Sequence, residues 1–440
     1  MKKSVFIILG VVLVIGVLVL IFMPREKLKE MNLPFSSPKT SESNTGESKY
    51  IAYGSTSDYK NGYFYIKDES HIMYYDYDTK KEVYLCNKPN CKHDSDTCSS
   101  YLGESSDNEL FYYDNHLYLA HSSSSNGGVS FSINGDGTVQ DSSMENPATI
   151  YKMDLDGTNK EKVFTAPSGA SLSMPFVVNG NKLYGFLQKS KVEKDSSGYN
   201  VARTSERKMV AINLDTGKYE EITDGMHKSF IGVFEDKLVV QEIDYLKDPD
   251  DFDDDTKGFV NNLYNSPTKI KLIDMNTKKE EIVYEGLFKE VETLKFYKDG
   301  IYFIGEKSKN LEYINVTTKE RETIKELPST GYEMNTIIDD KVLVYKYNNN
   351  YTHLDSAYSV DVNTKEMNKF NLRNANDYLV EILSSNDEYY FVLIEYVFGE
   401  EYTTWAGTKQ QDLIGTNYGL IKKSDYWDSK ANYIKMTNAK

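Results

Sequence analysis

Short stretches in which apolar and polar residues alternate recur along the chain, and their period of two residues predicts β-strands. The shortest uninterrupted example predicts four strands, Glu292–Tyr297, Gly300–Gly305, Leu311–Val316 and Arg321–Glu326. Turn-forming residues separate them, so the unit reads as an antiparallel meander. Such a sheet has two faces to cover and few residues to cover them with. It must therefore stack on neighbouring copies.

The second strand of this unit recurs seven times, each time as a turn residue followed by a bulky run. The copies are Gly62–Ile66, Asn115–Leu119, Asn181–Gly185, Asp236–Val240, Asp299–Phe303, Asp340–Val344 and Asp387–Phe391. Over residues 50–440 this is about 56 residues per copy, which is within the range of propeller blades.

The turn after the third strand has its own signature, in which an Asp or Asn opens the turn. Six copies are clear: Asp76–Lys80, Asp154–Thr158, Asn213–Gly217, Asp274–Lys278, Asn315–Lys319 and Asp361–Lys365. Asp and Asn side chains bond to the local backbone, and both residues and Gly tolerate the positive φ that a tight turn needs. Lys423–Trp427 is a degenerate seventh copy.

These repeats predict an all-β fold, a seven-bladed β-propeller, because radial stacking covers both faces of each sheet and leaves only short edges. A six- or eight-bladed ring and an open β-solenoid are the alternatives. The 36 Tyr residues suit half-buried strands, and no sustained helical period is found in the body.

Large insertions are expected in four loops between second and third strands: Ser122–Ala148, Lys189–Glu206, Tyr245–Pro267 and Phe398–Thr416. Successive turns of a meander alternate ends, so these loops and the connection Asn87–Asn108 are expected on one face. Loops on a rigid scaffold are where binding residues concentrate, although unconnected tolerated insertions are the alternative. The aromatic candidates for a binding face are Phe252, Phe259, Tyr264, Phe398, Tyr402 and Trp405.

The first 49 residues differ from the rest in composition. Ser4–Met23 is an uncharged apolar run that is long enough for a transmembrane anchor. Residues 1–3 before it are predicted to form a cytoplasmic tail. Residues 24–49 are polar and rich in Ser and Thr, which predicts a flexible stalk. Lys2 and Lys3 favour an inside N-terminus, so the body, residues 50–440, is expected outside a single-pass cell membrane protein. A cleaved signal peptide is the alternative.

The net charge of the chain is −16, and residues 30–440 alone sum to −20. A body this acidic does not attract polyanions at long range, which argues against nucleic acid as a partner. Asp248–Asp255 holds six carboxylates in eight residues, but it lacks the spacing of a known calcium loop. We therefore expect a solvated acidic loop there in preference to a calcium site.

All three cysteines of the chain lie between residues 86 and 98, a stretch called the cysteine segment below. Cys86, Cys91, His93 and Cys98 supply three thiols and an imidazole, a set that can surround zinc tetrahedrally. A disulfide between two of the cysteines is the rival prediction, with a free redox-active thiol behind both. Four protein ligands would leave no open position for a substrate, so even a zinc site would be structural.

The string from Leu85 to Cys98, Leu-Cys-Asn-Lys-Pro-Asn-Cys-Lys-His-Asp-Ser-Asp-Thr-Cys, resembles a motif of uncharacterised cell-surface β-propeller proteins of Gram-positive bacteria. These proteins are grouped as a domain of unknown function. The resemblance covers the anchor, this motif and the repeats. It implies a fold and a location, and no activity.

The sequence contains no nucleophile elbow, zinc-protease motif, phosphate-binding loop or dinucleotide fingerprint. We therefore expect a binding, sensor or scaffold module for a peptide, glycan or partner protein at the cell envelope, in preference to an enzyme. The alternative is a glycan-acting hydrolase or lyase that uses the propeller channel, whose residues would come from several blades and escape detection in a linear sequence.

Overall fold

The computed structural model covers the chain and describes residues 50–436 except 53–55, 60–61, 68–69, 104–107, 122–130, 134–138, 142–146, 195–199, 253–254, 349–352 and 404–408. The predicted tail, anchor and stalk lie outside the described residues. Within the described ranges, no helix is long and apolar enough to cross a membrane.

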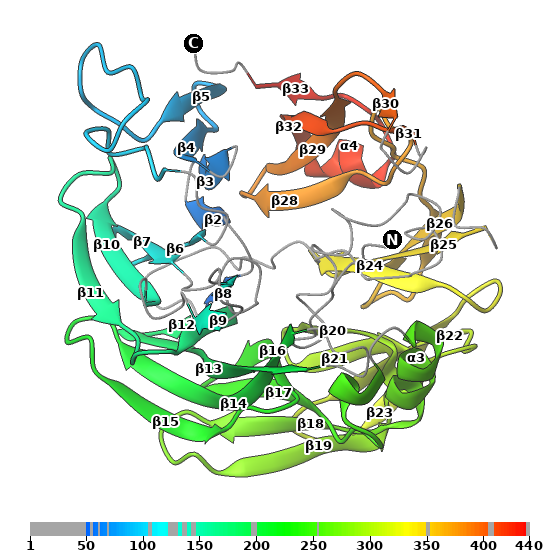
Figure 1. The fold of residues 1–440 in the computed structure, drawn as a ribbon. Coiled ribbons are helices and arrows are strands. Elements are labelled where there is room, and N and C mark those ends of the chain that lie inside the picture. The colour runs from blue at the N-terminus through cyan, green and yellow to red at the C-terminus, as the bar shows by residue number, and fades with distance from the viewer. Residues whose placement is uncertain are drawn as a thin grey trace. The chain divides into compact units, whose positions relative to one another are not determined.

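The chain divides into two compact units, and the first holds the described residues from Tyr50 to Phe230. Three antiparallel sheets of four or five strands form the body of this unit, beside the small sheet β8–β9 described below (Figure 1). The first is β2 (Thr56–Tyr59), β3 (Gly62–Lys67), β4 (His71–Asp76) and β5 (Lys81–Tyr84). The second is β6 (Asn108–Tyr113), β7 (His116–His121), β10 (Thr149–Asp154) and β11 (Glu161–Thr165). The third is β1 (Tyr50–Ala52), β12 (Ser171–Asn179), β13 (Lys182–Lys194), β14 (Asn200–Asn213) and β15 (Tyr219–Asp224).

The second unit holds residues 231–436 and four four-stranded sheets, the first of which starts at the boundary, beside the small sheet β30–β31 described below. The fourth sheet is β16 (Lys228–Phe234), β17 (Lys237–Ile243), β18 (Pro267–Asp274) and β19 (Glu280–Leu287). The fifth is β20 (Thr293–Tyr297), β21 (Gly300–Ile304), β22 (Asn310–Asn315) and β23 (Arg321–Glu326). The sixth is β24 (Glu333–Ile338), β25 (Lys341–Tyr347), β26 (Leu354–Asp361) and β27 (Met367–Lys369). The seventh is β28 (Glu381–Ser385), β29 (Tyr389–Phe398), β32 (Leu413–Lys422) and β33 (Ile434–Lys435).

The prediction of an all-β fold with seven propeller blades is confirmed, with one sheet for each predicted second strand among the described residues. The predicted unit at 292–326 is the fifth sheet, with strand ends close to those expected. Neighbouring sheets share apolar cores within each unit. Phe64 of the first sheet and Leu117 of the second belong to one core cluster, and Leu311 of the fifth and Val342 of the sixth belong to another. Stacking therefore covers the sheet faces as the pattern requires.

The six predicted turns lie between the third and fourth strands, and in five of them the opening Asp or Asn accepts backbone amide hydrogen bonds as expected. In the turn Asp154–Thr158 the acceptor is Asp156 instead, which is bonded by the amide of Thr158 at 3.0 Å. In the fifth sheet, Asn315 Oδ1 accepts hydrogen bonds from the amides of Thr317 and Thr318, each at 2.9 Å. The turn then reaches φ +61° at Lys319. The degenerate seventh copy, Lys423–Trp427, is wrong as a turn. It forms the short helix α4 (Lys423–Trp427), because Tyr426 is fully buried in the core of the seventh sheet.

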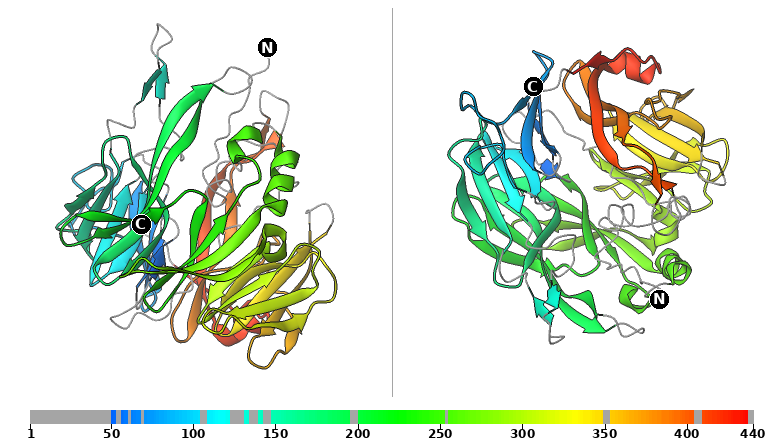
Figure 2. Two further views of the ribbon diagram at one scale, coloured as in Figure 1. Left: turned by 90° about the horizontal axis from the view of Figure 1, so that it is seen from below. Right: turned by 45° about the horizontal axis from the view of Figure 1, so that its top comes forward.

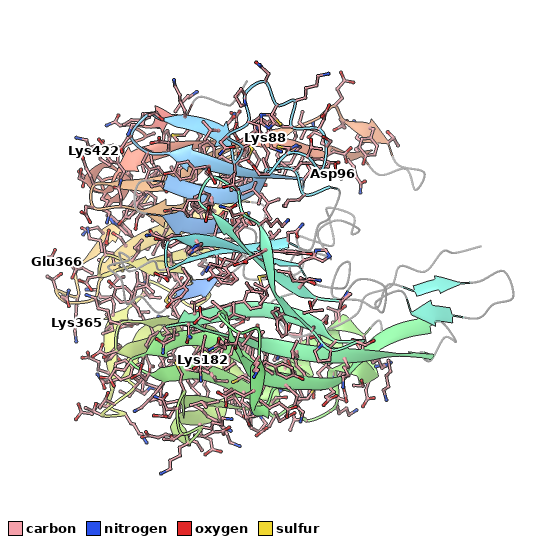
Figure 3. All side chains as sticks on the ribbon, turned by 90° about the vertical axis from the view of Figure 1, so that its left-hand side faces the viewer. Lys88, Asp96, Lys182, Lys365, Glu366 and Lys422 are labelled. Carbon is pink, nitrogen blue, oxygen red and sulfur yellow. The ribbon has the colours of Figure 1, made fainter. Side chains whose placement is uncertain are left out.

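The four predicted insertions differ in structure. Ser122–Ala148 contains the hairpin β8 (Phe131–Ile133) and β9 (Val139–Asp141), and Phe398–Thr416 contains β30 (Tyr402–Thr403) and β31 (Lys409–Gln410). Lys189–Glu206 is not a loop, because β13 and β14 continue to pair as far as Lys194 and Asn200. This long hairpin and β8–β9 project to the same side of the first unit (Figures 2 and 3).

The insertion Tyr245–Pro267 folds into a short 3₁₀ helix, η3 (Pro249–Phe252), and the ten-residue helix α3 (Thr256–Asn265). The sequence pattern did not predict this helix. Asp255, at the end of the acidic run, caps it by accepting a hydrogen bond from the amide of Gly258 at 2.9 Å. We refer to residues 245–267 as the helical insertion.

β1 adds a fifth strand to the third sheet, at the free edge of β12, with Tyr50 opposite Val178 and Ala52 opposite Phe176. β2, which follows β1 after three residues, belongs to the first sheet. The first two strands of the described chain therefore belong to two different sheets, the third and the first, and the remaining strands of both sheets follow later in the sequence.

Candidate metal centre

Both ends of the cysteine segment are attached to one residue of β4, Ile72. Before the segment, the amide of Leu85 donates to the carbonyl of Ile72 at 3.0 Å. After the segment, the amide of Ile72 donates to the carbonyl of Ser100 at 2.8 Å, and Ser100 Oγ donates to the carbonyl of Ile72 at 2.7 Å. Leu85 is buried in the core between the first two sheets. The segment is thus a closed loop on a buried base.

Inside the loop, tight turns bring the ligand-type residues back toward one another. Asn90 and His93 both have φ of +59°, and the amide of Cys98 donates to the carbonyl of Ser95 at 2.9 Å. Lys88 Nζ donates to the carbonyl of Thr97 across the loop. Asn tolerates positive φ better than most residues, and His93 adopts it where its ring turns inward.

The structure brings together all four residues that the sequence singled out. One ligand atom from each of Cys86, Cys91, His93 and Cys98 lies within 4.8 Å of all the others, and His93 Nδ1 is 3.2 Å from Cys98 Sγ. In a tetrahedral site with metal–sulfur bonds of about 2.3 Å, ligand atoms stand about 3.8 Å apart. The three cysteines are free thiols. The loop therefore contains a Cys₃His group of a size that can hold a metal ion.

The imidazole of His93 is fixed from two sides. Its ring stacks on Tyr84, with centroids 4.1 Å apart and planes 10° apart, and its backbone carbonyl is 2.6 Å from Nε2 of His71. A carbonyl can only accept, so His71 donates through Nε2, and its Nδ1 accepts from Ser70 Oγ at 2.8 Å. His71 therefore supports the loop and is not one of its ligands.

The pKa values of three residues in the Cys₃His group are shifted in different directions. Burial opposes ionisation of Cys86, but the amide of Lys88 and the thiols of Cys98 and Cys91 outweigh it and lower its pKa. Burial raises the pKa of Cys98 to about 11. Burial, followed by the nearby His71, lowers the pKa of His93, which keeps the imidazole neutral, the form that binds metal.

The loop contacts the second sheet at the turn between β10 and β11. Asn87 Nδ2 donates to Asp156 Oδ2 at 2.8 Å. Gly157 has φ +80°, and a Cβ there would lie 2.6 Å from the carbonyl oxygen of Leu85, so only glycine allows this approach. Figure 1 shows the segment beyond β5 and toward β10, and Figure 3 labels Lys88 and Asp96 on it. The sequence predicted the cysteine segment on the same face as the insertions. The segment instead contacts a turn between a third and a fourth strand, a type of turn expected at the opposite end of the blade.

The candidates in the helical insertion contact one another. The ring of Phe259 is 6.1 Å from that of Phe252 and 6.3 Å from that of Tyr245, and all three pack in one cluster. Tyr264 stacks on Phe288 of the following connection at 6.2 Å and donates a hydrogen bond to Glu292. These aromatic residues hold the insertion to its own unit.

The candidates in the other insertion are placed differently. Phe398 is half-buried with its ring 6.5 Å from Tyr396, and Tyr402 is 44% exposed and donates to Asp412 at 2.8 Å. Trp405 lies outside the described residues. Sequence reasoning missed Leu413 and Ile414, which are 53% and 62% exposed. Two adjacent aliphatic residues at a strand start are a detectable signal, but alternation would have assigned one of them to the core.

Comparisons with known proteins give structural likenesses only. No family model matches the chain, and no curated protein matches it. A puromycin-hydrolysing peptidase of Mycobacterium tuberculosis is 10% identical with a TM-score of 0.49, over 93% of this chain and 57% of that one. An oligogalacturonate lyase in complex with manganese is 10% identical with a TM-score of 0.40, over 76% of this chain and 84% of that one. This chain therefore spans little more than half of the peptidase, and at these scores neither likeness carries information on activity.

Proposed function

We propose that this chain is a membrane-held extracellular propeller that binds a peptide, glycan or partner protein, and that its cysteine segment carries a structural zinc ion. The predicted anchor at Ser4–Met23 and the polar stalk after it support the location. The resemblance of the Leu85–Cys98 motif to Gram-positive surface propellers supports it as well.

The observation that carries the binding role is the distribution of exposed apolar side chains. Of the ten large hydrophobic residues that are strongly exposed in the described part of the chain, five lie in two insertions between second and third strands. They are Leu246, Val260, Tyr402, Leu413 and Ile414. Apolar groups gathered on loops of a rigid scaffold favour contact with another molecule.

Zinc is the metal that fits the donor set best. Three thiolates and an imidazole are soft and borderline ligands, which favour zinc over the oxygen-seeking calcium and magnesium. With four protein donors around it, the ion has no open position, so its effect is on the stability of the loop. A disulfide would use two of the sulfur atoms and leave His93 without a role.

The binding role is tested by capture at the cell envelope. The full-length chain, a variant lacking residues 246–265, and a variant with an altered Asp361–Lys365 turn are cross-linked in cells and recovered. We expect the deletion to abolish capture of a defined partner and the turn variant to retain it. Equal capture by all three would remove the insertion from the binding surface.

The rival activity, action on a glycan in the channel, is tested with the same preparations. Release of reducing ends or unsaturated sugars from purified cell-wall polysaccharide would favour a hydrolase or lyase over a binding module. Zinc is tested separately by metal analysis of protein purified without reductant. We expect one zinc per chain, and metal-free protein with a single titratable thiol would establish the disulfide instead.

A further inference from the structure

Two glutamates in the second unit occupy the same structural position in neighbouring sheets. Glu333 begins β24 and lies opposite Tyr345, and Glu381 begins β28 and lies opposite Leu393. Tyr345 and Leu393 are each the fifth residue of the second strand of their sheet. The two carboxyl groups therefore belong to one register position of the first strands of the sixth and seventh sheets.

Neither glutamate has a cationic partner among the described residues. Glu333 accepts one hydrogen bond, from Tyr345 Oη at 2.8 Å, and Glu381 has no hydrogen bond or ion pair with any described residue. Burial raises the pKa of both, to about 7 for Glu381. A desolvated carboxylate is unfavourable unless a positive charge accompanies it, so this position is suited to a cation that the chain itself does not supply.

Four tyrosines lie around the same carboxyl groups. The rings of Tyr345 and Tyr347 are 5.5 Å apart and inclined at 81°, and those of Tyr378 and Tyr396 are 6.2 Å apart and also inclined at 81°. Burial raises the pKa of Tyr396, and Glu381, Tyr378 and Tyr347 raise it further, so the two ring pairs and the glutamate share one electrostatic environment. Tyr378 is 45% exposed and gives the cluster a side that is open to solvent.

A cationic side chain of the same unit, Arg373, is already engaged. Arg373 forms an ion pair with Asp377 at 3.4 Å and donates to the backbone carbonyls of Asp377 at 3.3 Å and Leu354 at 3.5 Å. It is close enough to lower the pKa of Tyr347, but it does not pair with either glutamate in the described structure. Arg373 therefore does not balance the charge that the two glutamates carry when they are ionised, and a bound cation would stabilise that ionised form.

We propose that Tyr345, Tyr347, Tyr378, Tyr396, Glu333 and Glu381 form a binding site for an organic ammonium cation. Perpendicular tyrosine rings present their electron-rich faces to alkyl groups on nitrogen, and the carboxylates supply the opposite charge. A hard metal ion is a poorer occupant, because it needs six or more oxygen ligands and two carboxyl groups are offered. The site stands independently of the proposed function.

The test is ligand-observed NMR with tetramethylammonium and, in a second arm, n-butylammonium, on the full-length chain. The first probe represents a quaternary ammonium group and the second a lysine side chain. We expect the wild-type chain to broaden the NMR signals of one or both probes, with an effect that saturates as the probe concentration rises. The probe that binds more tightly shows whether the natural ligand carries a quaternary ammonium group or a lysine-like primary amine. Tyr378→Leu should weaken binding about fivefold, since it removes one ring face.

The variant Glu333→Gln together with Glu381→Gln should abolish binding. Because these changes keep side-chain volume and remove buried charge, the double variant should melt at or above the wild-type temperature, which separates loss of binding from loss of folding. Tyr219→Leu is the matched control, since Tyr219 is 40% exposed and lies in the other unit. Absence of binding by the wild-type chain, equal binding by the double variant, or displacement of tetramethylammonium by calcium at lower concentration would each overturn the proposal.

Discussion

The cysteine segment and the helical insertion are both departures from the plain four-stranded blade, and they are held in different ways. The cysteine segment has a buried base at Ile72, but its interior converges on Cys86, Cys91, His93 and Cys98, which attract a metal. The helical insertion has a capped helix and an aromatic cluster of its own. We therefore expect the first to depend on a bound metal ion and the second on ordinary packing.

This difference predicts that removing a single donor atom damages the cysteine segment more than any single change damages the helical insertion. Cys98→Ser should reduce bound zinc to near zero and lower the stability of the first unit by about 3 kcal/mol or more, since a structural ion contributes its binding energy to folding. Metal analysis and thermal unfolding measure both effects. Ser95→Ala changes a non-ligand in the same loop and should leave both unchanged. Full metal content in Cys98→Ser would break the comparison.

The helical insertion should respond to loss of apolar volume instead. Leu263 is 8% exposed on α3, and Leu263→Ala should destabilise the insertion by about 2 kcal/mol. Hydrogen exchange of the α3 amides should quicken, with no dependence on chelators. Val260→Ala, at a 40% exposed position of the same helix, is the control and should have little effect. If a chelator loosened α3 as much as Leu263→Ala does, the two regions would not be separate.

A smaller effect is expected at the helix cap. Asp255 accepts a hydrogen bond from the amide of Gly258 at 2.9 Å, and Asp255→Ala should cost about 1 kcal/mol of helix stability. Asp255→Asn keeps the acceptor and should retain most of it. Exchange rates at the first turn of α3 distinguish the two variants, and identical rates would show that the cap contributes nothing.

The smallest expected effect is a dependence on pH. Burial raises the pKa of Glu292 above its ordinary value, although the hydrogen bond from Tyr264 opposes the shift. The folded state therefore binds a proton more tightly than the unfolded state, so stability is highest below about pH 4.5 and falls as pH rises through the folded pKa. We expect a loss of under about 1 kcal/mol because the group is half-buried. Glu292→Gln should flatten this part of the profile in thermal unfolding, and a steeper profile would contradict it.

How much the sequence could predict depends on how local the signal is. The fifth sheet was expected almost to the residue, because alternation and Asx turns such as the one at Asn315 act within a few positions. The metal-type group was expected because its four members lie within thirteen residues. The helix α3 was missed, since ten residues are too few to show a sustained period.

Features made by distant parts of the chain could not be predicted. Glu333 and Glu381 share a register position only after two sheets have formed, and their spacing in the sequence carries no motif. The extension of β13 and β14 was taken for a loop because its residues are polar on both sides of the hairpin tip. Polar strands that project beyond a core lack the apolar alternation on which strand prediction depends.

The placement of β1 has a mechanical consequence. A pull on the chain ahead of Tyr50 acts first on three residue pairs at the edge of β12, before it reaches β2. After β1 detaches, the chain from Tyr50 to Thr56 can extend to at most roughly 20 Å at about 3.3 Å per residue, while the first sheet stays intact. Detachment would also uncover backbone groups along β12 that another extended strand can pair with. Under tension we therefore expect β1 to detach first. Its release leaves the sheets folded and exposes the edge of β12.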